Sequence, residues 1–113
     1  MRPIIIRNSI VPRLASIFIS VYAITLFPFV FIRDEGNERV VRHETIHFWQ
    51  YMETLIIGFL LIYSYDFLKG LIKYRDTQKA YERIRFEQEA YENDYHRYYG
   101  LNRRRWAWRK YKV

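Results

Sequence analysis

The longest uncharged run in the first third of the chain extends from Leu14 to Ile32. Its length suits a transmembrane helix, which needs about 20 apolar residues. Residues 21–32, however, are rich in β-branched and aromatic side chains, which is typical of strands. Pro28 has no N–H group, so it restricts a strand there to an edge or a bend. We predict one or two short strands over 21–32, with a membrane span over 14–32 as the alternative.

A helix is predicted after the polar turn at residues 34–38. It begins at about Val40, and no helix-breaking residue follows before Gly58. Residues 54–63 are apolar on every side of such a helix, which indicates burial in protein or in lipid. The helical pattern then continues towards Tyr74.

A second helix is predicted from about Arg85 to Arg97, because Gly100 follows as a stop signal. The pattern predicts an α+β fold that is mostly α, with a short edge strand or hairpin, one long helix and a second helix. We expect a single domain over 1–113, with a basic N-terminal segment 1–13 and a basic aromatic C-terminal tail 101–113.

Composition limits the available chemistry, because the chain has no cysteine and a net charge of +7. Thiolate metal sites and cysteine nucleophiles are therefore excluded, and any metal site must use His, Asp or Glu. The basic ends suit an anionic membrane surface, a larger assembly or, less favoured, nucleic acid. In the tail, Trp106, Trp108 and Tyr111 alternate with basic residues and can stack bases, sit at a lipid interface or pack back on the domain.

His43 and His47 enclose the pattern His-Glu-x-x-His within the first predicted helix. Positions i and i+4 share one face of a helix, so both imidazoles can reach one ion at about 2.0–2.1 Å. Glu44 lies beside them and is placed to act as a general base on a water that zinc activates. The motif predicts one Zn²⁺ per chain, with His43 and His47 as metal ligands and Glu44 as the catalytic residue.

Two histidines leave a catalytic zinc site one protein ligand short, since such sites usually have three. In the second predicted helix, Glu87 and Glu89 point about 200° apart, so both cannot face the metal. Gln50 shares the face of His43 and is a candidate to bind a ligand carboxylate or the water. His96, the third histidine, is expected to be an ordinary residue at a helix end.

Three pieces of the chain carry a resemblance to known proteins: residues 23–33, 43–50 and 80–91. HExxH followed, after an apolar helix, by Glu-x-x-Ala resembles the gluzincin metallopeptidases, in which the first Glu of the second motif is a zinc ligand. Over most of residues 10–110 the chain more closely resembles a family of small HExxH proteins of bacteria and their phages.

The resemblance implies that Glu87 is the third ligand. Many gluzincins have Asp four residues later, where this chain has Tyr91, so Glu89 with Asn93 is the rival register. Tyr91 and Asn93 are thus candidates to hydrogen-bond to the metal ligands without binding the metal. The resemblance implies a zinc site more strongly than it implies proteolysis.

Closing the site constrains the path from His47 to Glu87. A helix unbroken to Tyr74 would carry the chain roughly 40 Å from His47. An extended return over 75–85 would span about 36 Å, so it nearly suffices. We favour that return over a break near 64–70. A bilayer span at 55–72 would separate His47 from Glu87, although a helix in the membrane plane would not.

These observations predict a zinc-dependent hydrolase and favour a peptidase acting on a peptide or protein, with the strand at 21–32 pairing with extended substrate. The rival is a non-catalytic structural or interaction protein, such as a phage or membrane-assembly subunit, that keeps a metal for stability. The expected location is cytoplasmic or peripherally membrane-associated, and the oligomeric state is left open.

Overall fold

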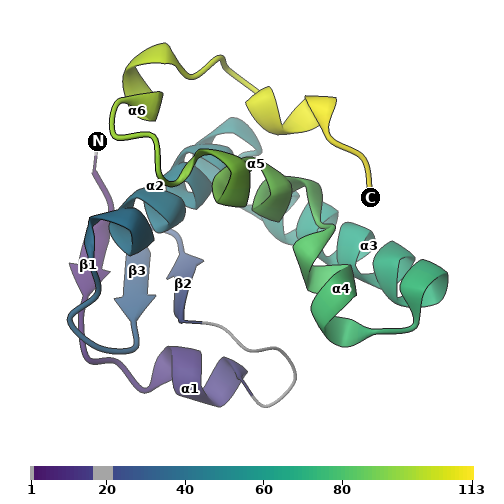
Figure 1. Cartoon of the computed structure of the whole chain (residues 1–113), viewed down its shortest axis with the longest axis horizontal. Helices are drawn as coiled ribbons and strands as arrows, with labels where there is room; N and C mark the ends of the chain where they lie inside the picture. The colour runs from purple at the N-terminus through teal and green to yellow at the C-terminus, as the bar shows by residue number, and fades with distance from the viewer. Residues whose placement is uncertain (1, 17–21) are drawn as a thin grey trace.

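The computed structural model describes residues 2–16 and 22–113. Its fold is α+β and mostly helical, so the predicted fold class is confirmed. Figure 1 shows a small sheet at one side and helices over the rest of the molecule. The strands are β1 (Ile4–Ile6), β2 (Ala23–Leu26) and β3 (Phe29–Ile32); the helices are α1 (Val11–Ala15), α2 (Glu38–Glu53), α3 (Ile57–Tyr74), α4 (Thr77–Glu82), α5 (Arg85–Asn93), α6 (Tyr99–Asn102) and the 3-10 helix η1 (Ala107–Lys110).

The apolar segment before the HExxH helix forms a β-hairpin over its described part. β2 and β3 pair antiparallel, and the turn between them contains a cis peptide bond at Phe27–Pro28. The prediction of short strands with Pro28 at a bend is therefore confirmed for residues 22–32. The part of the expectation that concerns 17–21 lies outside the described residues.

β2 is an edge strand, because the order in the sheet is β1-β3-β2. Arg33 N donates to Tyr22 O (3.1 Å), so Tyr22 and Arg33 form a hydrogen-bonded pair of the antiparallel ladder. Such pairs alternate, which makes Ile24 and Leu26 the residues of β2 that bond to β3. The backbone groups of Ala23 and Thr25 consequently point towards the free edge.

The predicted long helix is wrong, because it breaks into α2 and α3 at Leu55 and Ile56. Both residues have a positive φ (58° and 67°), and the two helices are bent by 113°. Ile56 N donates to Tyr51 O (2.8 Å), which satisfies one of the last carbonyls of α2. Left-handed backbone normally indicates Gly or Asn, so two large apolar residues gave no sequence signal of a break.

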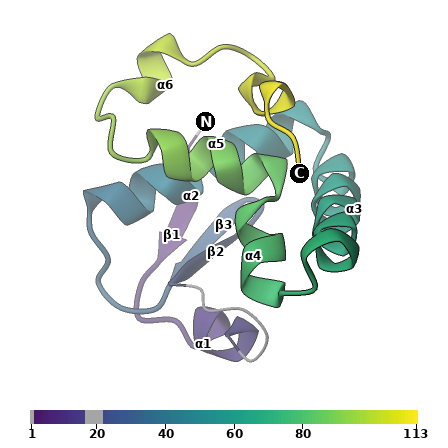
Figure 2. The same ribbon diagram turned by 45° about the vertical axis from the view of Figure 1, so that its right-hand side comes forward.

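The predicted extended return is wrong as well, because the chain returns through α4. Helices α3 and α4 form a helical hairpin, as Figure 2 shows, and Arg75 ends α3 in the left-handed conformation. Gly70 makes the close packing possible, since a Cβ at Gly70 would lie 3.0 Å from Ala80 Cα. The Asp76 side chain caps α4 by accepting from Lys79 N (3.1 Å).

Asp66 fixes the start of α5 against α3. Its carboxylate is fully buried and accepts hydrogen bonds from the backbone N, Nε and Nη2 of Arg85, at 3.1, 2.9 and 2.9 Å. An ionised carboxylate away from water is stable only when it is paired in this way. The pair therefore sets where α5 begins, two residues before Glu87.

An aromatic cluster joins α2, α3, α5 and η1. The ring of Phe59 lies 3.7 Å from that of Tyr51 and 4.5 Å from that of Phe86, and Trp108 lies 4.8 Å from Phe86 between centroids. Trp108 is buried, so this part of the tail packs back on the domain. Trp106 remains exposed.

Within the described part of the chain, no single helix is both long and apolar enough to cross a bilayer. Helices α2 and α3 reach the required length and composition only when taken together as a bent pair.

Replacing Asp66 by Asn is expected to lower the free energy of unfolding by about 2 kcal/mol, because Arg85 loses its charged partner in a buried setting. Chemical denaturation with a metal chelator present measures this loss. Glu82→Gln is the matched control, since Glu82 is an exposed acid of α4, and its effect should stay within about 0.5 kcal/mol. Equal effects for the two variants would contradict the role of Asp66.

Candidate metal centre

Helix α2 brings the three residues of the motif to one buried face. Its start is capped by the Asn37 side chain, which accepts from Val40 N (2.9 Å). His43, Glu44 and His47 are all buried. The two imidazole rings are 4.9 Å apart between centroids and are inclined at 79°.

His43 is oriented by an acid that the sequence analysis did not single out. Its Nδ1 lies 2.9 Å from Asp94 Oδ2, and Asp94 Oδ1 accepts from Arg39 Nε at 2.7 Å. Once the ring is neutral, an acceptor at Nδ1 favours the tautomer with a proton there, which makes the Nε2 lone pair available to a metal. Asp94 follows α5 directly, so only the folded chain brings it near His43.

His47 is oriented in the same sense by Gln50. Its Nδ1 lies 2.7 Å from Gln50 Oε1, while Gln50 Nε2 donates to Phe86 O (3.1 Å) and Glu89 Oε1 (2.9 Å). These two acceptors fix which end of the amide faces His47. The sequence predicts that Gln50 binds a ligand carboxylate or the water. In the structure its Oε1 contacts the His47 imidazole, and its Nε2 donates to the carboxylate of Glu89, the alternative ligand.

Glu87 completes a convergent set of donor atoms. Its Oε1 lies 3.1 Å from His43 Nε2 and 3.1 Å from His47 Nε2, and its Oε2 accepts from Tyr63 OH at 2.7 Å. Neighbouring ligands around a tetrahedral zinc, with bonds of about 2.0–2.1 Å, are roughly 3.3 Å apart. Both separations from Glu87 Oε1 are close to this spacing, so the three residues could hold a metal ion. Tyr63, which the sequence did not indicate, binds the other oxygen of the Glu87 carboxylate.

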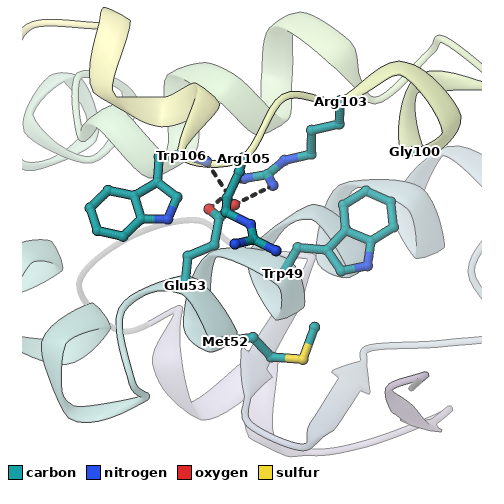
Figure 3. A pocket seen from close by; sticks show the side chains of 7 residues that line it. All are labelled: Trp49, Met52, Glu53, Gly100, Arg103, Arg105 and Trp106. Carbon is teal, nitrogen blue, oxygen red and sulfur yellow. Dashed lines mark hydrogen bonds and ion pairs between the residues drawn. The ribbon is translucent and has the colours of Figure 1, made fainter.

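Glu89 takes part in a different cluster on the opposite side of α5. Its carboxylate accepts from Tyr99 OH (2.8 Å) and Arg103 Nε (2.7 Å). Arg103 also donates to both oxygens of Glu53, at 2.8 and 2.9 Å, and Figure 3 shows this pair. Asn93, its partner in the rival register, donates to the backbone O of Glu89.

Of the other candidate residues, Tyr91 contacts His43 and His96 does not take part in the described centre. Tyr91 is in contact with it, since its ring centroid is 4.4 Å from that of His43 and its hydroxyl hydrogen-bonds to that of Tyr81 (2.8 Å). His96 is exposed and lies after α5.

Glu44 is held by the edge strand. Its Oε1 accepts from Thr25 Oγ1 at 3.0 Å, and its Oε2 lies 3.7 Å from His43 Nε2. The ligand atoms of His43, Glu44 and His47 all lie within 4.8 Å of one another, so Glu44 is a rival third ligand. We favour Glu87, because one of its oxygens is closer and equidistant from both Nε2 atoms.

The electrostatics of the cluster follow from three carboxylates around two rings. Burial opposes the charged form of His43, but Asp94, Glu87 and Glu44 outweigh it and raise its pKa to about 10. Burial likewise opposes the charged form of His47, whose pKa is nevertheless raised by Glu87. Burial opposes the charged form of Glu87 as well, yet the two imidazoles hold its pKa below the ordinary value. Burial raises the pKa of Glu44.

Two cavities flank the centre along β2. One, of about 280 Å³, is mainly apolar and is lined by residues that include His47, Phe59 and Glu87. The other, of about 350 Å³, is lined by residues that include His43 and Asp94. Ala23, Glu44 and Tyr81 line both, so the two cavities adjoin at Glu44.

A broader concavity of about 540 Å³ lies away from the histidines, between the end of α2 and the tail (Figure 3). Trp49 and Trp106 line it, and Glu53 accepts from Trp106 N at 2.7 Å. It contains none of the convergent donor atoms, so its size does not make it the chemical centre.

Comparison of the chain with family models, with curated proteins and with solved structures finds no match. The assignment of a function therefore depends on the geometry of the centre.

Zinc binding is expected to release protons, because both imidazoles must be neutral to bind metal. With the pKa of His43 at about 10 and that of His47 raised, the metal-free protein should release more than one proton per zinc at pH 7. The apparent affinity should then rise more than about tenfold per pH unit near pH 7 and level off above the pKa of His43. Calorimetry in buffers of different ionisation enthalpy measures the released protons, and a value of zero at pH 7 would contradict this electrostatic account.

Proposed function

We propose that the protein is a zinc-dependent hydrolase of peptide bonds, with zinc held by His43, His47 and Glu87. The observation that carries the proposal is the convergence of three donors. Both Nε2 atoms lie 3.1 Å from Glu87 Oε1, while acceptors hold both Nδ1 atoms. A zinc ion bound by these residues would polarise a substrate carbonyl and lower the pKa of a bound water towards about 7.

Glu44 is the proposed general base. Thr25 donates to one of its oxygens, which leaves Oε2 nearer the imidazoles as the proton acceptor. Burial raises its pKa, which moves the carboxyl towards the operating pH that favours proton transfer. Glu44 would take a proton from the attacking water at Oε2 and pass it to the leaving amine.

The edge of β2 supports a peptide as the substrate. The backbone groups of Ala23 point away from β3, and Ala23 lines both cavities beside Glu44. An extended peptide can add to such an edge through main-chain hydrogen bonds. Thr25 O is already bonded to Tyr51 OH (2.8 Å), so Ala23 is the main pairing point.

Metal-dependent stability without catalysis is the second candidate function. The burial of the ligand set favours it, because a metal there would also tie α2 to α5 and stabilise the folded state by mass action.

The Glu44→Gln variant separates the two candidates. It is expected to keep one zinc per chain and to lower the cleavage of quenched fluorescent peptides by about 10²–10⁴-fold, since the general base is lost. Glu82→Gln, an exposed acid, serves as the matched control and should keep both properties. Glu87→Gln should lose zinc.

Three outcomes would go against the proposal. Undiminished cleavage by Glu44→Gln would contradict general-base catalysis. Loss of zinc from Glu44→Gln would make Glu44 a ligand. Zinc binding without any cleavage by the unaltered protein would favour the stabilising role.

A further inference from the structure

The outer side of α3 is an uncovered apolar face. Figure 2 shows α3 at the margin of the molecule, with α4 on its inner side. At 100° per residue, the exposed apolar side chains fall within an arc of roughly 140°. We call this surface the α3 face; its residues are Ile57, Leu60, Leu61, Tyr65, Leu68 and Ile72.

The turn before α3 extends the same apolar surface. Leu55 is 84% exposed and has a φ of 58°, and Ile56 has a φ of 67°. An exposed left-handed turn normally carries Gly, Asn or Asp, because large side chains are strained there and gain nothing from water. Burial of Leu55 against a further apolar phase would offset this cost.

The hairpin of β2 and β3 adds exposed apolar residues next to the α3 face. Leu26 and Leu60 both line the apolar cavity beside His47, and both are exposed. Leu26 and Phe29 are both exposed at the tip of the hairpin. The apolar area thus extends from the turn and α3 to the end of the sheet, more than the scattered apolar residues of an ordinary surface.

The exposed charged side chains of α3 itself are positive. Lys69 and Lys73 are exposed along one border of the arc. Beyond its end, Arg75 is exposed beside the exposed Asp76. Asp66 is the only acid of α3, and it is buried against Arg85 on the opposite side. An apolar helix face with a cationic border and no exposed acid matches the boundary of an anionic bilayer.

We propose that the α3 face and the turn at Leu55 bind in the plane of an anionic lipid surface. A second copy of the chain fits less well, because each copy carries a net charge of +7 and would bring its lysine border against that of the other. The inference depends on neither the metal nor the catalytic activity.

Vesicle binding tests this inference directly. The full-length protein is expected to sediment with vesicles of phosphatidylglycerol and phosphatidylcholine, and more weakly with phosphatidylcholine alone. The double variant Leu61→Glu/Leu68→Glu should lower the partition coefficient by about tenfold or more, since two apolar side chains proposed to enter the lipid become charged. Leu101→Glu is the matched control, because Leu101 is 82% exposed on α6, and its partition should change less than about twofold.

The absence of cysteine allows a second readout by site-specific labelling. An environment-sensitive fluorophore on Leu61→Cys should shift to the blue with anionic vesicles and be quenched by brominated lipids, whereas the same label on Leu101→Cys should not. Circular dichroism of each variant checks that it is folded.

Two results would overturn the proposal. One is equal vesicle binding by the Leu61→Glu/Leu68→Glu variant and the unaltered protein. The other is a dimer in light scattering that this variant converts to a monomer, with no binding of the unaltered protein to anionic vesicles.

Discussion

The contact of the Glu87 carboxylate with both imidazoles is the constraint on which the rest of the fold depends. It joins a residue of α5 to two residues of α2 that lie forty or more positions earlier. Without a carboxylate or a metal between them, the two imidazoles would be buried without a partner for their Nε2 atoms, and burial of an unpaired polar group is unfavourable. The break at Leu55, the α3–α4 hairpin and the anchoring of α5 by Asp66 all serve to bring Glu87 to this place.

Buried polar networks on either side of α5 keep the donor atoms in position. Asp94 and Gln50 orient the two imidazoles, while Tyr63 holds the far oxygen of Glu87. On the other side, Arg103 binds Glu53 and Glu89, and Glu89 in turn accepts from the amide of Gln50. The orientation of His47 is therefore coupled to the C-terminal tail through Gln50 and Glu89. The basic tail thus supports the centre indirectly, because its Arg103 pairs with Glu89.

The sequence predicted the elements with local signals and missed those that depend on distant contacts. The i, i+4 spacing of His43 and His47 located one half of the centre, and Pro28 located the hairpin turn. The break at Leu55 had no local signal, since its backbone is held by packing and by the bond from Ile56 to Tyr51. Asp94 and Tyr63 could not be selected among many acids and tyrosines, because only the tertiary fold brings them to the ligands.

The proposed function requires that His43, His47 and Glu87 hold one metal ion beside Glu44 and the edge of β2. Crystallographic anomalous scattering at the zinc edge, from protein loaded with zinc, tests this most directly. The account predicts a single peak within about 2.0–2.2 Å of His43 Nε2, His47 Nε2 and an oxygen of Glu87, with Glu44 outside bonding distance. A peak bonded to Glu44 or Glu89 in place of Glu87, or no peak between the imidazoles, would contradict it.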